Sequence, residues 1–278
     1  MIAVLIHAHK NKHQLEILVN ALQHLEIKIF LHLDSKAEFT FYNPSVELIQ
    51  SPVSVTWGSF SQVKALLHSL TQIQQSPQAF DFVHFISGQD FPIKPVASFV
   101  NYLYAHKGFS FVHHKRIPEE WPECAVRYQR YYFLESKWLN AQWAKSIFKA
   151  LTYLYKRKPP VPVYGGSQWV TLSGEAVNYL LSNSMQVQKV TRFLNHCNVA
   201  DELFVQTVLL NSPLRAKCIN DNLRFINWSN AQIQHSDSPL VLTLDNFAQI
   251  KSSPHFFARK FDITIDEQVV RKIRAELL

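Results

Sequence analysis

Residues 2–34, IAVLIHAHKNKHQLEILVNALQHLEIKIFLHLD, contain the pattern that decides the fold. The stretch opens with a short, continuous apolar run at Ile2–His7, which is typical of a strand buried in a parallel sheet. Leucines and a valine then recur with helical spacing over His13–Leu25, and a second apolar run at Ile27–Leu33 stops at Asp34. Strand, helix and strand in this order predict a βαβ unit, whose ligands collect beyond the carboxyl ends of the strands. Asp34 occupies such an end and is therefore a candidate ligand-binding residue.

Strand and helix patterns continue to alternate along the chain. We expect further strands at Val53–Thr56, Phe80–Ile86, Phe109–His113, Ala216–Ile219 and Asn222–Asn227, and a glycine turn together with a strand within Tyr164–Thr171. We expect helices at Ser61–Gln74, Val96–Tyr104 and Gly174–Leu181. No internal repeat or low-complexity linker interrupts residues 1–278, so we predict a single α/β domain with a mostly parallel central sheet flanked by helices.

Composition excludes several classes of protein. With 47% hydrophobic and 18% charged residues, the chain of 278 residues is globular rather than disordered. Six glycines, none of them in a GxGxxG pattern, argue against a nicotinamide enzyme. Three widely separated cysteines argue against a disulfide framework or a zinc site. The first nine residues resemble a strand rather than a leader. From both observations we expect a cytoplasmic protein. The formal charge of +7 predicts an anionic partner: a nucleotide, a nucleic acid or a membrane surface.

The segment of about residues 115–160 is a predicted insertion, rich in aromatic and basic residues and helical in character. Within it, Lys137–Lys158 forms an amphipathic pattern, and prolines follow from Pro159. One interpretation is an interfacial helix that makes a peripheral contact with the inner face of a membrane. The alternative is an ordinary helix packed into the domain.

The pair Asp201-Glu202 stands directly before the apolar run of NVADELFVQTVLLNSP, residues 198–213. Helical spacing in that run places both carboxylates in the first turn of an expected helix. The pair then has two interpretations. It either caps the helix start and complements its dipole, or it supplies a general base at the edge of a cleft.

Several blocks, taken together and in order, resemble one family. They are HLD at 32–34, VTWGS at 55–59, FISGQDFP at 85–92, GSQW at 166–169, DE at 201–202, RFINW at 224–228 and FARKFD at 257–262. The chain resembles the core-2/I-branching β-1,6-N-acetylglucosaminyltransferases, a family that includes the peptide O-xylosyltransferases, and it looks like a bacterial type. The likeness runs from about Ile2 to Asp262. It implies a GT-A-like fold, a UDP-sugar donor, inversion at the anomeric carbon and no required metal or other cofactor.

The resemblance also implies roles for individual residues. Glu202 matches the general base that activates an acceptor hydroxyl. Asp34 and Trp57 match the uridine pocket, and Gly58 belongs to the same donor-binding block. Lys260 matches the lysine that neutralises the diphosphate. An arginine expected about twenty residues earlier is absent from Gln234–Ser238, and Arg259 or Arg224 is the candidate replacement.

Some assignments have structural alternatives. The chain has no DxD pair, so fixed cations such as Arg259 and Lys260 are expected to stabilise the leaving diphosphate; the alternative is a solvated basic pair. Asp90 either contacts the donor sugar or caps the SGQDFP turn, and Trp169 either stacks on an acceptor sugar or is a core aromatic. Asp201 and Glu120 are the remaining acceptor-binding candidates. His7 and His9 lack a third ligand nearby, so no metal site is predicted.

The sequence thus predicts an inverting, metal-independent glycosyltransferase. The expected donor is UDP-N-acetylglucosamine, with UDP-xylose or another UDP-hexose as the alternative, and the expected acceptor is a glycan or a lipid-linked oligosaccharide. Two further classes are a nucleic-acid-binding module and a non-catalytic sugar-binding relative. Dispersed cations count against the first, so no nucleic acid partner is expected, and the retained Glu202 and Lys260 count against the second.

Overall fold

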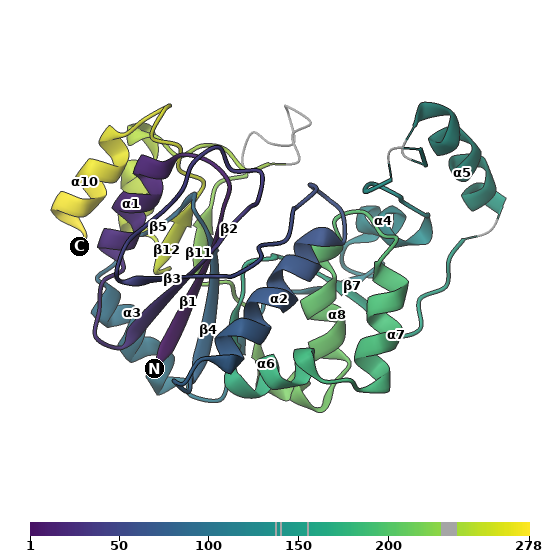
Figure 1. Cartoon of the computed structure of the whole chain (residues 1–278), viewed down its shortest axis with the longest axis horizontal. Helices are drawn as coiled ribbons and strands as arrows, with labels where there is room; N and C mark the ends of the chain where they lie inside the picture. Colours follow the sequence, from purple (N-terminus) through teal and green to yellow (C-terminus); the bar gives the residue numbers. More distant parts are fainter. Residues whose placement is uncertain (137, 140, 155, 229–237) are drawn as a thin grey trace. The chain divides into compact units, whose positions relative to one another are not determined.

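The computed structural model describes residues 1–136, 138–139, 141–154, 156–228 and 238–278. The chain forms two compact units, and Figure 1 labels many of their helices and strands. Unit 1 comprises Met1–Ile49, Phe80–Lys107 and Leu223–Leu278, and unit 2 comprises Gln50–Ala79 and Gly108–Asn222. A single domain stays a prediction, because two compact units within one chain are compatible with one domain or with two.

Unit 1 is built on four parallel strands in the order β4-β1-β2-β3. These strands are β1 (Ile2–Ala8), β2 (Ile27–Leu33), β3 (Val46–Leu48) and β4 (Phe82–Ser87). β1 is central, and residues 2–6 of it are completely buried. A strand that is buried on both faces needs a continuous apolar run rather than an alternating one, which is why IAVLIH predicts it. The predicted α/β class with a mostly parallel sheet is confirmed.

A second sheet of unit 1 has the strand order β11-β12-β5. Its strands are β5 (Asp90–Pro92), β11 (Arg224–Ile226) and β12 (Phe257–Arg259). The remaining elements of the unit are α1 (Lys12–Ala21), α3 (Val96–Ala105), the 3-10 helix η4 (Leu244–Asn246), α9 (Phe247–Ser252) and α10 (Gln268–Glu276). Antiparallel pairing of β12 with β5 places Arg259 opposite Asp90, so the predicted turn SGQDFP and the predicted basic pair lie side by side.

Unit 2 is mainly helical. Its helices are α2 (Ser61–Gln75), η1 (Pro122–Ala125), α4 (Val126–Gln129), α5 (Gln142–Leu154), α6 (Gly174–Leu181), α7 (Met185–Leu194), η2 (Ala200–Glu202), α8 (Phe204–Leu210) and η3 (Pro213–Lys217). Its strands are β6 (Ser110–Phe111), β7 (Lys115–Ile117), β8 (Val163–Gly165), β9 (Thr171–Ser173) and β10 (Cys218–Ile219). Every residue of α8 is buried, which makes this short helix part of the core of the unit.

One predicted strand is absent, and one predicted helix is shorter than expected. Val53–Thr56 is not a strand; the strand after β2 is β3, a three-residue edge strand with partly or fully exposed side chains and therefore little apolar signal. The helix expected at His13–Leu25 is α1, which begins after the cap Asn11 and ends at Ala21. Leu25 keeps the leucine spacing but is exposed, because the chain has already turned toward β2.

The predicted basic helix is shorter than its pattern. The structure has α5 at Gln142–Leu154 within the expected Lys137–Lys158, and Lys137 and Tyr155 lie outside the described residues. In the part of the chain that the structure describes, no helix combines the length and apolar character needed to cross a membrane.

Candidate active site

The acidic pair of unit 2 lies in a separate turn rather than in the first turn of a long helix. Asp201 and Glu202 end the 3-10 helix η2, and α8 begins two residues after Glu202. Val199, just before η2, has the left-handed backbone (φ 52°) that β-branched residues rarely adopt. Its N–H donates to the Gly58 carbonyl at 2.7 Å, so the predicted donor-binding glycine fixes the turn that carries the acids.

Gly58 itself has a positive φ of 73°, and a Cβ there would lie 2.9 Å from the Asn198 side-chain oxygen. A glycine is therefore needed at this position for a structural reason that is independent of any ligand.

Glu202 forms an ion pair with Arg127, whose Nη1 donates to Glu202 Oε2. Both side chains are partly exposed, and the Arg127 guanidinium lies over the Trp121 ring, 5.0 Å from its centroid. Burial disfavours the charged guanidinium, but the Glu202 carboxylate outweighs burial and raises the pKa of Arg127. The pair therefore favours an ionised Glu202. Arg127 was not predicted from the sequence, since an arginine within a basic, aromatic segment carries no motif.

Asp201 is held from the opposite side by Gln62 of α2. Gln62 Nε2 donates to Asp201 Oδ2 at 3.1 Å and to Gln168 Oε1 at 3.2 Å, while Gln62 Oε1 accepts from the Gly58 N–H at 2.8 Å. The other oxygen, Asp201 Oδ1, is buried and has no hydrogen-bond partner among the described residues. Burial, followed by the neighbouring Glu202 charge, raises the pKa of Asp201 to about 7. The two acids therefore have different surroundings, although they are adjacent in the sequence: Glu202 pairs with an arginine and Asp201 with an uncharged amide.

The other candidate sugar- and donor-binding residues of unit 2 differ in their exposure to solvent. Trp57 is exposed, and Trp169 is buried, as expected of a core aromatic. Glu120 is exposed and accepts from the Arg116 N–H at 2.6 Å, which closes the turn after β7. Sugar contacts by Trp169 and Glu120 stay predictions.

In unit 1, Asp34 lies directly beyond the carboxyl end of β2, as predicted. Its N–H donates to the Ala8 carbonyl at 2.9 Å, and its Oδ1 accepts from the Lys36 N–H at 2.9 Å. The Asp34 side chain is buried, and these two hydrogen bonds hold the turn that follows β2. A uridine contact by Asp34 stays a prediction.

Asp90 is a fully buried acid between two arginines. Its Oδ2 accepts from the Ser87 N–H at 2.5 Å, so it caps the SGQDFP turn, as one of the two interpretations predicts. Its Oδ1 lies 3.9 Å from Arg224 Nε and 3.6 Å from Arg259 Nη1. Arg224 is also buried and donates to the Phe85 carbonyl. The structure thus gives Asp90 and Arg224 a structural role, and any sugar or phosphate contact by them stays a prediction.

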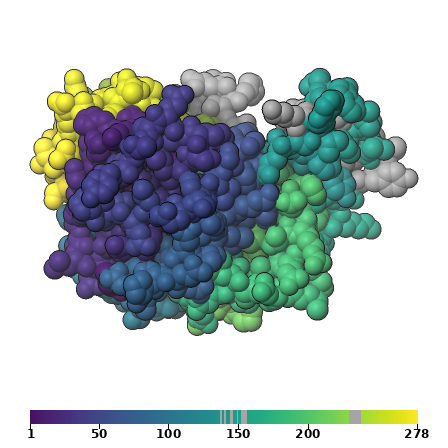
Figure 2. Space-filling model, viewed as in Figure 1, coloured from purple at the N-terminus to yellow at the C-terminus, as the bar shows by residue number. Residues whose placement is uncertain are grey.

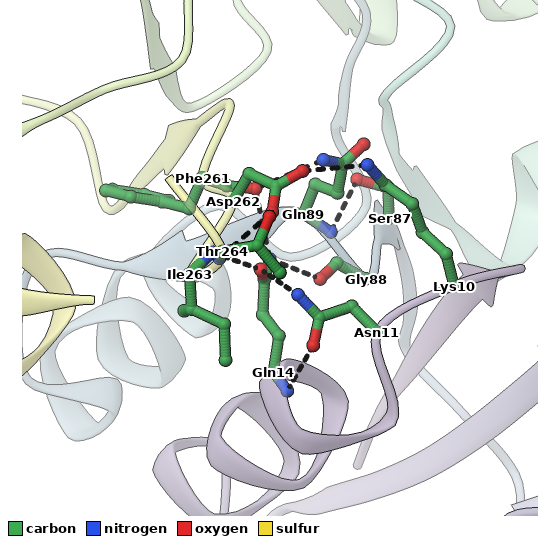
Figure 3. A network of polar contacts seen from close by, with 10 residues as sticks. All are labelled: Lys10, Asn11, Gln14, Ser87, Gly88, Gln89, Phe261, Asp262, Ile263 and Thr264. Atoms are coloured by element: carbon green, nitrogen blue, oxygen red, sulfur yellow. Dashed lines mark hydrogen bonds and ion pairs between the residues drawn. The ribbon is translucent and has the colours of Figure 1, made fainter. Parts of the chain in front are cut away.

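Cations meet where β1 and β12 end. Lys260 follows β12 directly and is half-buried; burial, then Lys10 and Arg259, lower its pKa despite the opposing effect of Asp262. Lys10, which follows β1, forms an ion pair with Asp262 at 2.8 Å. Figure 3 shows this ion pair beside the turn at Ser87, Gly88 and Gln89. Lys10 was not predicted from the sequence, because it is one of four lysines and histidines within the polar run at residues 9–14 and belongs to no motif.

The histidines at the same edge are structural. The His7 ring lies 4.5 Å from that of His32 and 4.6 Å from that of Phe85, and burial lowers the pKa of His7 well below its usual range. Among the described residues, no group of three or more His, Cys, Asp or Glu side chains could hold a metal ion.

Comparisons with known proteins identify one family and a set of similar xylosyltransferases. The family model described as Core-2/I-Branching enzyme matches residues 2–251. Xylosyltransferase oxt of Drosophila melanogaster is 26% identical over 94% of this chain and 31% of its own length. Xylosyltransferase 1 of Rattus norvegicus is 24% identical over 99% of this chain and 35% of its own length. The chain thus spans about a third of the length of these curated relatives.

One solved structure, the apo form of mouse xyloside xylosyltransferase 1, covers 93% of this chain and is itself covered over 97% of its length. Its TM-score is 0.41 and its sequence identity 8%, values too low for any argument about this chain.

Proposed function

The chain belongs to the Core-2/I-Branching enzyme family, and from this premise we propose that it is an inverting, metal-independent glycosyltransferase. In the proposed reaction a sugar moves from a UDP-sugar to a hydroxyl group of a glycan acceptor. One observation carries the proposal: Glu202 is a partly exposed carboxylate, next to a turn of fixed backbone, and it is ion-paired with Arg127.

An inverting transfer needs one base on the acceptor side of the anomeric carbon. We assign this role to Glu202, which takes the proton of the acceptor hydroxyl as that oxygen attacks the anomeric carbon. The bond from the anomeric carbon to the β-phosphate oxygen breaks at the same time, and UDP leaves with the electron pair. The Arg127 guanidinium favours the ionised form of Glu202, which is the form that accepts a proton.

The leaving diphosphate needs positive charge, which we assign to Lys260 and Arg259 at the end of β12. Preorganised cations stabilise developing negative charge without a bound metal ion. Arg224 is excluded from this role in the proposal, because its side chain is fully buried and engaged with Asp90 and the Phe85 carbonyl. Uracil is assigned to Asp34 and to the exposed ring of Trp57, which is available for stacking.

Two donors compete in the proposal. UDP-N-acetylglucosamine is favoured by the family to which the chain belongs, whereas the relatives named xylosyltransferases favour UDP-xylose. The two sugars differ in a C2 acetamido group and a C6 hydroxymethyl group. Release of UDP from each donor, measured with a panel of glycan acceptors, separates the alternatives directly.

The test of the function compares Glu202→Gln with a matched control, Glu175→Gln, in the same unit. Glu175 is an exposed glutamate that pairs with Lys217, so its substitution makes the same chemical change away from the acidic pair. We expect acceptor-dependent UDP release to be lost in the first variant and kept in the second. Equal loss in both variants, or none in either, contradicts the proposed base.

A lipid-linked acceptor is part of the proposal, because α5 presents apolar side chains at the surface. Trp143, Ile147 and Leu151, spaced four residues apart on one face, are 60%, 53% and 48% exposed. Figure 2 shows the segment around α5, in teal, at the surface of the molecule. Such a face inserts into the headgroup region of a bilayer, and exposed Lys156 and Lys158 suit anionic lipid.

Flotation with anionic and neutral vesicles tests this contact. We expect binding to anionic vesicles at low salt that is lost in a Trp143→Ser, Ile147→Ser variant. Absence of wild-type binding at low salt supports the alternative of a helix without a membrane role.

A further inference from the structure

Unit 1 concentrates positive charge at one edge of its sheets. Lys10 follows β1, Arg259 ends β12 and Lys260 comes next. The pKa of Lys260 is lowered by burial and then by Lys10 and Arg259, in that order, so the three cations are close enough to repel one another. The pKa of His9 is likewise lowered by burial, by Lys10 and by Lys260. Like charges that the fold holds together in a half-buried place favour an anionic ligand there.

Within this cluster, the ion pair between Lys10 and Asp262 is asymmetric. Asp262 is fixed: its Oδ1 accepts from the Thr264 hydroxyl at 2.6 Å and from the Thr264 N–H at 3.2 Å. Its Oδ2 accepts from Lys10 Nζ at 2.8 Å, and these hydrogen bonds lower the pKa of Asp262 against the effect of burial. The Lys10 side chain is 45% exposed, compared with 10% for Asp262. Lys10 is therefore the partner that can change its position, since its long stem has water around it.

The backbone beneath this ion pair is held by Gln14, a buried residue of α1. Its Nε2 donates to the Gly88 carbonyl at 2.9 Å and to the Phe261 carbonyl at 3.1 Å, and its Oε1 accepts from the Ile263 N–H at 3.0 Å. Figure 3 shows these contacts converging between α1 and the segment from Phe261 to Thr264. Hydrogen bonds of Gln14 thus connect α1 to the segment after β12.

We propose that Lys10 is a further phosphate-binding residue, which exchanges its ion pair with Asp262 for one with the diphosphate of a bound nucleotide. The identity of the anion as a nucleoside diphosphate rests on the proposed function. An ion pair with a half-exposed lysine is weak in water, whereas a diphosphate offers more negative charge and several acceptor oxygens. Asp262 then acts as a competitor that holds Lys10 near Lys260 until the phosphates arrive.

Isothermal titration of UDP, UMP and uridine into the wild type and three variants tests the exchange. The variants are Lys10→Met, which keeps the stem and removes the charge, and Asp262→Asn, which removes the competitor. Lys12→Met is the matched control, because Lys12 lies two positions away and is exposed at the start of α1.

We expect Lys10→Met to weaken UDP binding about ten-fold, as for the loss of one charge-assisted contact, and to leave uridine binding unchanged. Asp262→Asn should tighten UDP binding, and Lys12→Met should match the wild type. The two substitutions in the ion pair are thus expected to change UDP affinity in opposite directions. A purely structural ion pair would instead lower the thermal stability of both variants and shift UDP and uridine affinities together.

Unchanged UDP affinity in Lys10→Met overturns the inference while leaving the proposed function intact. Weaker UDP binding in Asp262→Asn overturns the exchange. If the wild type binds pyrophosphate but no UDP, and Lys10→Met weakens pyrophosphate binding, then the anion site stands and the nucleotide donor of the proposed function is wrong.

Discussion

Replacing Asp201 by asparagine removes a titration that the fold places near neutral pH. Burial, followed by the Glu202 charge, raises the pKa of Asp201 from its usual value of 3.8 to about 7. The native state therefore keeps a proton that the unfolded state gives up between about pH 4 and pH 7. Because the native state binds more protons in this window, the free energy of unfolding falls as the pH rises through it, and the loss is complete above pH 7.

The magnitude follows from the shift. Each pKa unit corresponds to ~1.4 kcal/mol, so a shift of about three units gives an upper limit of ~4 kcal/mol. The Asp201 residue keeps some solvent exposure, and solvent screening lowers this limit. We therefore expect the free energy of unfolding of the wild type to fall by roughly 2–3 kcal/mol across the window. Asparagine has the shape of the protonated acid and still accepts from Gln62, so the stability of the variant should approach that of the wild type at about pH 4, the acid end of this window.

Urea unfolding at about pH 4 and at about pH 8.5 measures this effect. Taking the difference between variant and wild type cancels the buried histidines, which titrate alike in both proteins. We expect the stability of Asp201→Asn to be close to that of the wild type at about pH 4 and to exceed it by roughly 2–3 kcal/mol at about pH 8.5. Asp245→Asn, the same change at an exposed site, serves as the control. A difference between Asp201→Asn and wild type that is the same at both pH values refutes the reasoning.

Three other substitutions and one treatment with chelator have defined outcomes. Glu202→Gln should keep UDP binding and lose ~10²–10⁴-fold in turnover, the usual share of a general base, and near wild-type turnover would remove Glu202 from this role. Gly166→Ala places a Cβ 2.0 Å from the His113 carbonyl oxygen, so thermal melting should show a loss of at least ~2 kcal/mol; an unchanged melting temperature contradicts the close approach. Gln14→Leu removes the hydrogen bonds that Gln14 makes to the Gly88 carbonyl, the Ile263 N–H and the Phe261 carbonyl, the last of which keeps Gln89 as a donor, and should cost at least ~2 kcal/mol in urea unfolding and weaken UDP binding. Full activity in excess chelator is expected from a site that uses Lys260 and Arg259, and activity restored by Mn²⁺ would contradict it.

Segments with a strong period were predicted within a few residues. The helix expected at Gly174–Leu181 is α6, that at Ser61–Gln74 is α2 to within one residue, and the strand expected at Phe80–Ile86 is β4. Weakly patterned elements were missed. α7 and α10 are amphipathic helices with only three buried residues each, so polar residues dominate their sequences.

The sequence by itself determined the α/β class, the βαβ start and the family, because these depend on local periodicity and on ordered blocks of residues. It also selected Glu202, Asp34 and Lys260 as candidates. Only the tertiary structure decided which distant side chains contact the acids near these candidates. Arg127 pairs with Glu202 over 75 residues of sequence, Gln62 donates to Asp201 over 139 residues, and Lys10 pairs with Asp262 over 252 residues. A side chain's charge state and partner depend on distance and on exclusion of water, which packing sets and local sequence does not. Lys10 and Lys12 are the same residue two positions apart, yet the fold gives only the first a carboxylate and a neighbouring cation.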